Sequence, residues 1–150
     1  MEKGISIEGV KGVQYLYHEP CHTPMKTYAS LEVAGSLLGK TVKLSDRCCG
    51  EAGTLAIARP DIATQLRFRK QQELKSGIKE MTGADKAVNG NVKLLTSCPA
   101  CQQGLERYNE DTGLETDYIV VELANKKLGD GWQQRFIEQA KAGGIERVLL

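Results

Sequence analysis

Short segments rich in β-branched and aromatic residues alternate along the chain with segments of helical periodicity. The four strand-like segments cover residues 13–17, 41–44, 92–96 and 117–121. Each is followed by a stretch in which apolar residues recur three or four positions apart, the spacing of one helix face. Alternating strands and helices are typical of parallel sheets, because each helix carries the chain back to the start of the next strand. The sequence therefore predicts an α/β fold with three layers, in which helices cover both faces of a mainly parallel sheet.

Proline, glycine and the apolar periodicity predict where the helices lie. A first helix is expected to begin at Thr23 and Pro24 and to end at Gly39. A short helix over residues 54–58 and a long helix from Pro60 follow, and a loop is expected over residues 83–91. Further helices are expected from Pro99 to Tyr108, over residues 122–128 and around Trp132 and Phe136, with one more short strand at residues 145–150.

Two sets of side chains in these helices allow predictions about burial. The cationic residues of the long helix lie off its apolar stripe, so they predict a solvated face; they are Arg67, Arg69, Lys70 and Lys75. Trp132 and Phe136 are large and aromatic, so we expect them in the core.

All five cysteines come directly after predicted strands. Cys21 follows the first strand, Cys48 and Cys49 follow the second, and Cys98 and Cys101 follow the third. In open α/β sheets, ligand sites lie outside the carboxyl ends of the strands. The sequence therefore predicts that the five thiols meet at one edge of the sheet.

Several chemistries remain open for such a site. Adjacent cysteines rarely form a disulfide with each other, whereas a bend at Gly50 would let Cys48 and Cys49 bind one metal. Thiolates bind zinc and iron–sulfur clusters. Five cysteines exceed the four ligands of tetrahedral zinc, which favours a cluster, or zinc with one spare thiol. A metal-free dithiol at Cys98 and Cys101 is the further alternative.

Local features refine the expected roles of individual residues. Cys101 falls in the first turn of a predicted helix, where free backbone N–H groups favour a thiolate. His18 is expected to make structural hydrogen bonds rather than to bind metal. For His22, beside Cys21, two roles are equally expected: supporting a metal ligand from the next layer of residues, or a purely structural role.

Charge and composition exclude several classes of function. Twenty basic residues against nineteen acidic ones give no basis for binding nucleic acid. Met1 is followed by Glu2 and Lys3 rather than by an apolar signal segment, so we expect a cytoplasmic protein that contacts membranes only through partners. No GxGxxG follows the first strand, so a nicotinamide or flavin site of that type is not expected on this chain.

Three motifs resemble, in order, those of the cysteine-rich CCG domain. They are Tyr17-His18-Glu19-Pro20-Cys21-His22, Cys48-Cys49-Gly50-Glu51-Ala52-Gly53 and Ser97-Cys98-Pro99-Ala100-Cys101. This domain occurs in a subunit of heterodisulfide reductase and in the iron–sulfur subunit of glycolate oxidase. The resemblance implies a [4Fe-4S] iron–sulfur cluster, which in heterodisulfide reductase is of the noncubane type. The ligands that it implies in this chain are Cys21, Cys48, Cys49, Cys98 and Cys101.

The same resemblance implies a context for the chain. Residues 1–150 would form a single domain, the C-terminal piece of a larger flavin-linked oxidoreductase that acts on a 2-hydroxy acid or a disulfide. The domain would transfer electrons without being a complete enzyme. FAD would lie in a partner, which is expected to be a flavoprotein or another iron–sulfur domain or subunit. A zinc-binding docking domain stays open as the alternative.

Overall fold

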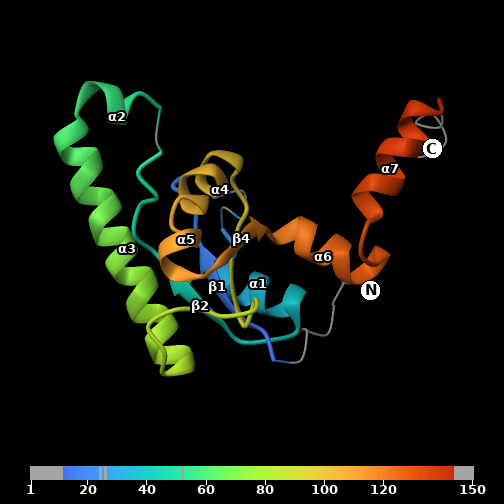
Figure 1. Cartoon of the computed structure of the whole chain (residues 1–150), viewed down its shortest axis with the longest axis horizontal. Helices are drawn as coiled ribbons and strands as arrows, with labels where there is room; N and C mark the ends of the chain where they lie inside the picture. Colours follow the sequence, from blue (N-terminus) through green and yellow to red (C-terminus); the bar gives the residue numbers. More distant parts are fainter. Residues whose placement is uncertain (1–11, 24, 26, 52, 144–150) are drawn as a thin grey trace.

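A four-stranded parallel sheet forms the centre of the molecule (Figure 1). The computed structural model describes residues 12–23, 25, 27–51 and 53–143, so the strand expected at residues 145–150 lies outside it. The strands are β1 (Gln14–His18), β2 (Val42–Ser45), β3 (Val92–Thr96) and β4 (Glu115–Tyr118). They are ordered β2-β1-β3-β4, and each neighbouring pair is parallel. The predicted parallel sheet is confirmed.

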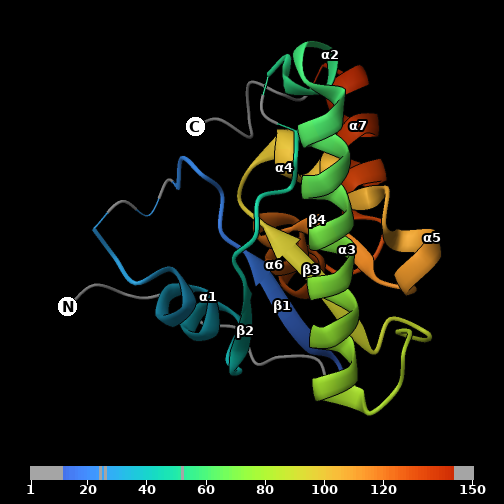
Figure 2. The same cartoon turned by 90° about the vertical axis from the view of Figure 1, so that its left-hand side faces the viewer.

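Helices cover both faces of this sheet, which confirms the three-layer fold. Because side chains alternate along a strand, Leu16 and Leu94 face one side and Tyr15 and Tyr17 face the other. Helices α3 (Pro60–Thr82) and α4 (Pro99–Glu106) pack on the first side through residues such as Leu74 and Leu105. Helices α1 (Ser30–Leu38) and α6 (Ile119–Leu128) pack on the second side. Figure 2 shows α1 and α3 on opposite sides of β1.

Most helix boundaries follow the predicted signals. Pro60 and Pro99 are the first residues of α3 and α4, where the missing N–H of proline costs no hydrogen bond. Helix α3 ends at Gly83, whose φ of 75° is a left-handed conformation that glycine adopts readily. The short helix α2 (Leu55–Ala58) and the late helix α7 (Trp132–Lys141) are also found, and a single-turn helix, α5 (Asn109–Thr112), follows α4.

Two predicted boundaries are wrong for identifiable reasons. Helix α1 begins at Ser30, because the Thr23 hydroxyl accepts a hydrogen bond from the Met25 N–H at 3.3 Å and forms a local turn instead of a helix cap. Strand β4 ends at Tyr118, and the β-branched residues that follow it start α6. Ile119 and Leu123 are four residues apart and pack into the same core, so helical packing overrides the strand propensity.

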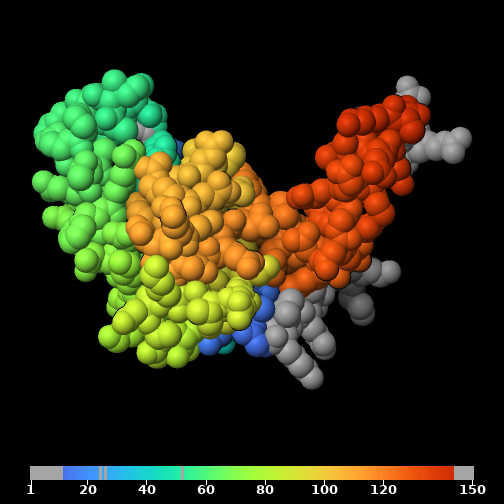
Figure 3. All heavy atoms as spheres, viewed as in Figure 1, coloured from blue at the N-terminus to red at the C-terminus, as the bar shows by residue number. Residues whose placement is uncertain are grey.

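The burial predictions need two corrections. Lys70, expected on a solvated face, is fully buried, whereas Arg69 and Lys75 are exposed as expected. Trp132 is only half-buried and Phe136 is 43% exposed, so neither belongs to the core. Of the described residues of α7, none is buried, because this helix extends beyond the sheet next to α6 (Figure 3).

None of the helices within the described residues is long and apolar enough to span a membrane.

Candidate metal centre

The five cysteines lie on the connections that leave the carboxyl ends of three strands. Cys21 follows β1, Cys48 and Cys49 follow β2, and Cys98 and Cys101 follow β3. Each of the five thiols is free of a disulfide. Cys49 and Cys101 are buried, Cys48 and Cys98 are half-buried, and Cys21 is exposed. The predicted gathering of cysteines at one edge of the sheet is therefore what the fold produces.

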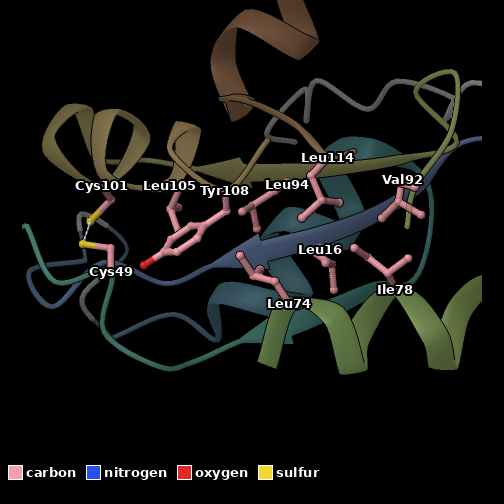
Figure 4. Close-up of a cluster of buried hydrophobic side chains, with 11 residues drawn as sticks. Leu16, Cys49, Leu74, Ile78, Val92, Leu94, Cys101, Leu105, Tyr108 and Leu114 are labelled. Carbon is pink, nitrogen blue, oxygen red and sulfur yellow. Dashed lines mark hydrogen bonds between the residues drawn. The ribbon is translucent and has the colours of Figure 1, made fainter. Parts of the chain in front are cut away.

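Two of these thiols meet inside the protein. The Sγ atoms of Cys49 and Cys101 are 3.5 Å apart and form a hydrogen bond, although the residues are 52 positions apart in the chain. This distance is far longer than the ~2.05 Å of a disulfide bond. In Figure 4 the two side chains point toward one another, one from the loop after β2 and the other from α4. The pair forms the buried end of the cysteine group.

Glycine shapes the turn that carries Cys48 and Cys49. Gly50 has a φ of 78°, a conformation that other residues adopt with strain, and its N–H lies 3.3 Å from the Cys48 sulfur. The next residue, Glu51, forms ion pairs with Arg107, which caps the end of α4, and with Arg67 of α3 at 3.7 Å. The bend inferred from the sequence is thus present, and charge pairs hold it against both helices.

The two cysteines at the start of α4 have pKa values shifted in opposite directions. Cys98 is the N-cap residue of this helix. Burial alone would raise the pKa of the Cys98 thiol, but the backbone N–H of Cys101, the Cys101 thiol and the Ala100 N–H hold that pKa below its usual value. Burial raises the pKa of Cys101 far above its usual value, and the Cys49 thiol raises it further. The expectation that the helix terminus would favour a thiolate at Cys101 is wrong, because the free N–H groups of Ala100 and Cys101 point to the Cys98 sulfur.

Electrostatic interactions connect the remaining thiols to this pair. Burial raises the pKa of Cys21, and the neighbouring thiols of Cys48 and Cys49 add to the increase. Burial also raises the pKa of Cys49, to which Cys48 and Cys98 contribute. All five cysteines therefore interact within one group. Among the described residues, however, the tight set of possible metal ligands comprises Cys49, Cys101 and His18, whose ligand atoms lie within 4.8 Å of one another.

His18 makes the structural hydrogen bonds that the sequence predicted. The side chain is 1% exposed at the end of β1, and its Nδ1 lies 3.1 Å from the Ser45 carbonyl oxygen and 3.2 Å from the Lys70 Nζ. Burial lowers the pKa of the imidazole to about 4, and the charge of Lys70 contributes. Its place beside Cys49 and Cys101 was not expected. His22, by contrast, is exposed.

Lys70 supplies a buried positive charge beneath the thiols. Its Nζ donates to the Ser45 hydroxyl at 2.5 Å and to Glu73 Oε2 at 2.8 Å. Burial lowers the pKa of Lys70, while Glu73 and, less strongly, Cys49 oppose that shift. A signal for its burial was present in the sequence, because position 70 falls on the same helical stripe as Ala63, Leu74 and Gly77.

Several buried polar atoms among the described residues have no hydrogen-bond partner, and three of them lie at the strand ends or in the core beside the thiols. These three are His18 Nε2, Thr96 Oγ1 and the Tyr108 hydroxyl oxygen. Thr96 pairs with His18 in the sheet register, and Figure 4 shows the Tyr108 hydroxyl directed toward Cys49. A buried polar group without a partner costs ~1–3 kcal/mol. Thiols combined with unsatisfied polar atoms fit a site for a thiolate-bound metal or cluster, which would supply partners for those atoms.

Comparisons with known proteins agree with the cysteine motifs. A family model described as a domain of unknown function, DUF3400, matches residues 106–150. An uncharacterized iron–sulfur protein of Methanococcus maripaludis is 28% identical over 117 residues, covering 71% of this chain and 21% of that protein. The glycolate oxidase iron–sulfur subunit of Escherichia coli is 38% identical over 82 residues, covering 51% of this chain and 20% of the subunit.

The chain thus spans about a fifth of the length of these curated relatives. No solved structure matches it. The three cysteine motifs, their order in the chain and the iron–sulfur names of these two relatives agree with the resemblance to the cysteine-rich CCG domain.

Proposed function

We propose that this chain is an electron-transfer domain that binds an iron–sulfur cluster at the cysteine edge of its sheet. The observation that carries the proposal is the buried pair of free thiols, Cys49 and Cys101, 3.5 Å apart at the point where three cysteine loops meet. The two relatives, one named as an iron–sulfur protein and the other as an iron–sulfur subunit, support it. The cluster would supply one-electron redox chemistry when bound.

The chain's own residues would hold the cluster and set its surroundings. We assign the ligands to Cys21, Cys48, Cys49, Cys98 and Cys101, and a [4Fe-4S] cluster of the noncubane type is the form that would use five thiolates. Lys70 and the N-terminus of α4 would offset the negative charge of the thiolates. The Tyr108 and Thr96 hydroxyls would donate hydrogen bonds to sulfur, which is one way in which proteins tune cluster potentials.

The setting that we propose follows from the relatives' names. The Escherichia coli relative is named as a subunit of glycolate oxidase. By analogy, this domain would pass electrons within a larger flavin-linked oxidoreductase that acts on a 2-hydroxy acid or a disulfide. FAD would be bound by a partner domain or subunit. We place the assembly in the cytoplasm, a reducing compartment that would keep the five thiols free.

Anaerobic loading with iron and sulfide tests the cluster. We expect the purified chain to acquire broad visible absorbance, bound iron and acid-labile sulfide. Cys48→Ser and Cys49→Ser should each lose most of that iron, because both remove a thiolate ligand. Trp132→Ala is the control, since Trp132 is half-buried at the start of α7, donates a hydrogen bond to Asn125 of α6, and should change no iron content. Unchanged iron in both cysteine variants would contradict the proposal.

One observation favours a second candidate, a zinc-binding docking domain. His18, Cys49 and Cys101 form a compact mixed set, and zinc is commonly bound by cysteine together with histidine. Metal analysis of the anaerobically purified protein separates the two candidates. Stoichiometric zinc without iron or acid-labile sulfide would support the docking domain. Neither metal, with one reversible disulfide between Cys98 and Cys101, would instead indicate a dithiol oxidoreductase.

A further inference from the structure

His18 is placed as a metal ligand would be, although the ligands implied by the three motifs are all cysteines. The imidazole is 1% exposed, and one of its nitrogens lies within 4.8 Å of the sulfurs of Cys49 and Cys101. Its Nε2 is buried and has no hydrogen-bond partner among the described residues. Leaving such a nitrogen unpaired inside a protein is costly, so a partner for Nε2 is to be sought in the group that the thiols bind.

The hydrogen bonds of Nδ1 determine what Nε2 can do. Nδ1 lies 3.1 Å from the Ser45 carbonyl oxygen, which can only accept a hydrogen bond. Lys70 Nζ is 3.2 Å away, but it has closer acceptors in the Ser45 hydroxyl and Glu73. Nδ1 therefore carries the proton and donates it to Ser45, which leaves a lone pair on Nε2. Metal-binding histidines typically donate their other N–H to a carbonyl or carboxylate in this way.

We propose that His18 is itself a ligand of the iron–sulfur cluster and binds iron through Nε2 beside Cys49 and Cys101. The inference rests on the proposed function, since it requires that the chain binds a cluster. Binding adds one Nε2–Fe bond, formed by the nitrogen lone pair. It releases no proton and changes no oxidation state. Ser45 acts as a positioning residue, because its carbonyl oxygen accepts the Nδ1 hydrogen bond and so holds the ring in the orientation that directs Nε2 toward the metal. Lys70 supports this position by donating to the Ser45 hydroxyl.

A neutral imidazole in place of a thiolate changes the redox behaviour of a cluster. Each thiolate adds one negative charge, which favours the oxidised state, whereas imidazole adds none. In Rieske centres, histidine ligands raise the reduction potential well above that of all-cysteine clusters. We therefore expect His18→Cys, which would place a thiolate where the imidazole lies, to shift the potential of this cluster to more negative values.

Isotope labelling of the unaltered chain gives the direct test. The 150-residue sequence contains two histidines, His18 and His22. The protein is loaded anaerobically with iron and sulfide, and pulsed electron paramagnetic resonance is recorded in the oxidation state that carries unpaired spin. A strong nitrogen coupling that changes when ¹⁵N-histidine replaces ¹⁴N-histidine is expected. His22→Ala is the matched control, because that exposed neighbour of Cys21 should be dispensable for the coupling.

Two variants extend the test to function. His18→Gly should lose the coupling and regain it with added imidazole, and His18→Cys should lose the coupling and lower the midpoint potential. Circular dichroism checks that each variant is folded, and the labelled wild type gives an answer even if neither folds. A wild-type cluster without strong histidine nitrogen coupling would overturn the ligand assignment and leave the proposed function standing. Failure of the wild-type chain to bind iron would overturn the proposed function, and the ligand assignment with it.

Discussion

At the scale of single residues, Cys98 and Cys101 show how one motif creates two different thiols. Cys98 occupies the N-cap of α4 and receives backbone N–H groups, which lower its pKa. Cys101 lies one turn further on, buried against Cys49, and its pKa is raised. Although only two residues lie between them, Cys98 is therefore the more reactive thiol and Cys101 the buried, less reactive one.

This difference predicts the order of alkylation in the metal-free protein. At neutral pH a thiol of lower pKa is more fully ionised, so Cys98 should react with iodoacetamide before Cys21, although Cys21 is the more exposed of the two. As the pH rises, the rate at Cys98 should level off first, while the rate at Cys21 continues to increase. Mass spectrometry of digests after short exposures measures both rates. Faster reaction at Cys21 throughout would show that exposure outweighs ionisation.

A second prediction concerns the buried charge of Lys70. Lys70→Met removes an ammonium group bonded to Ser45 and Glu73 and leaves the Glu73 carboxylate, which is 19% exposed, without its charged partner, although the Ser45 hydroxyl and the Asp46 N–H still donate to it. Removing one partner of a fully buried pair costs ~3–5 kcal/mol, and we expect about 2–3 kcal/mol here, because water reaches Glu73.

Urea unfolding of the metal-free protein measures this cost. Lys75→Met, at an exposed position of the same helix, is the control and should change the unfolding free energy by less than ~0.5 kcal/mol. Equal effects of the two substitutions would mean that Lys70 contributes nothing through its buried contacts.

The residues of the site differ in how far the sequence could predict them. The cysteines could be placed at one edge, because the end of a parallel strand fixes the edge at which the next residues lie. The second nitrogen of His18 could not be assigned, since its availability depends on Ser45 and Lys70, which are 27 and 52 positions away. Position 70 lies on the buried stripe of α3, but a lysine there was predicted to be exposed because of its charge.

At the scale of elements, Gly104 allows α4 to pack closely against the turn formed by Cys48–Glu51. A β-carbon added at Gly104, within α4, would overlap the Cγ of Glu51. Alanine normally stabilises a helix interior by ~1 kcal/mol relative to glycine. We expect the opposite sign here: Gly104→Ala should destabilise the protein by about 1–3 kcal/mol, a typical cost of overpacking, and should lower iron uptake by displacing the turn.

Shortening the opposing side chain provides the control. Glu51→Ala removes the overlapping Cγ, so Gly104→Ala introduced into that background should cost far less than in the wild type. Glu51→Ala alone also loses the ion pair with Arg107, and a double-mutant cycle separates the two effects. Equal costs in both backgrounds would show that the contact is not the cause.

Element boundaries were predictable where local chemistry decides them. Proline at the first helical position and glycine after the last one defined α3 correctly, because both act through the backbone of their own residues. The end of β4 was not predictable in this way. Val120 is 60% exposed and Ile119 is buried, and this pattern follows from packing against Tyr15 and Ala34, which lie far away in the sequence.

At the scale of the whole molecule, we expect the isolated chain to carry electrons without turning over a substrate. The loaded domain should accept electrons from a chemical reductant, because a cluster needs only a donor. With glycolate, lactate or glycerol phosphate and a dye acceptor, no reaction is expected until a flavoprotein partner is added, since hydride removal from a hydroxy acid requires a cofactor such as flavin. Turnover by the flavin-free chain would show that the domain is itself a catalyst.

The parallel sheet also determines when a metal can be captured during biosynthesis. Cys49 and Cys101 meet only after β3 has paired beside β1, and they are separated by 52 positions of chain. Closing such long loops slows folding, because their entropy must be lost before the contacts form. In a zinc finger, by contrast, the metal itself drives a short chain to fold. We therefore expect the metal-free chain to fold before the two thiols can share a metal, so that delivery of the proposed cluster would be a separate, later event.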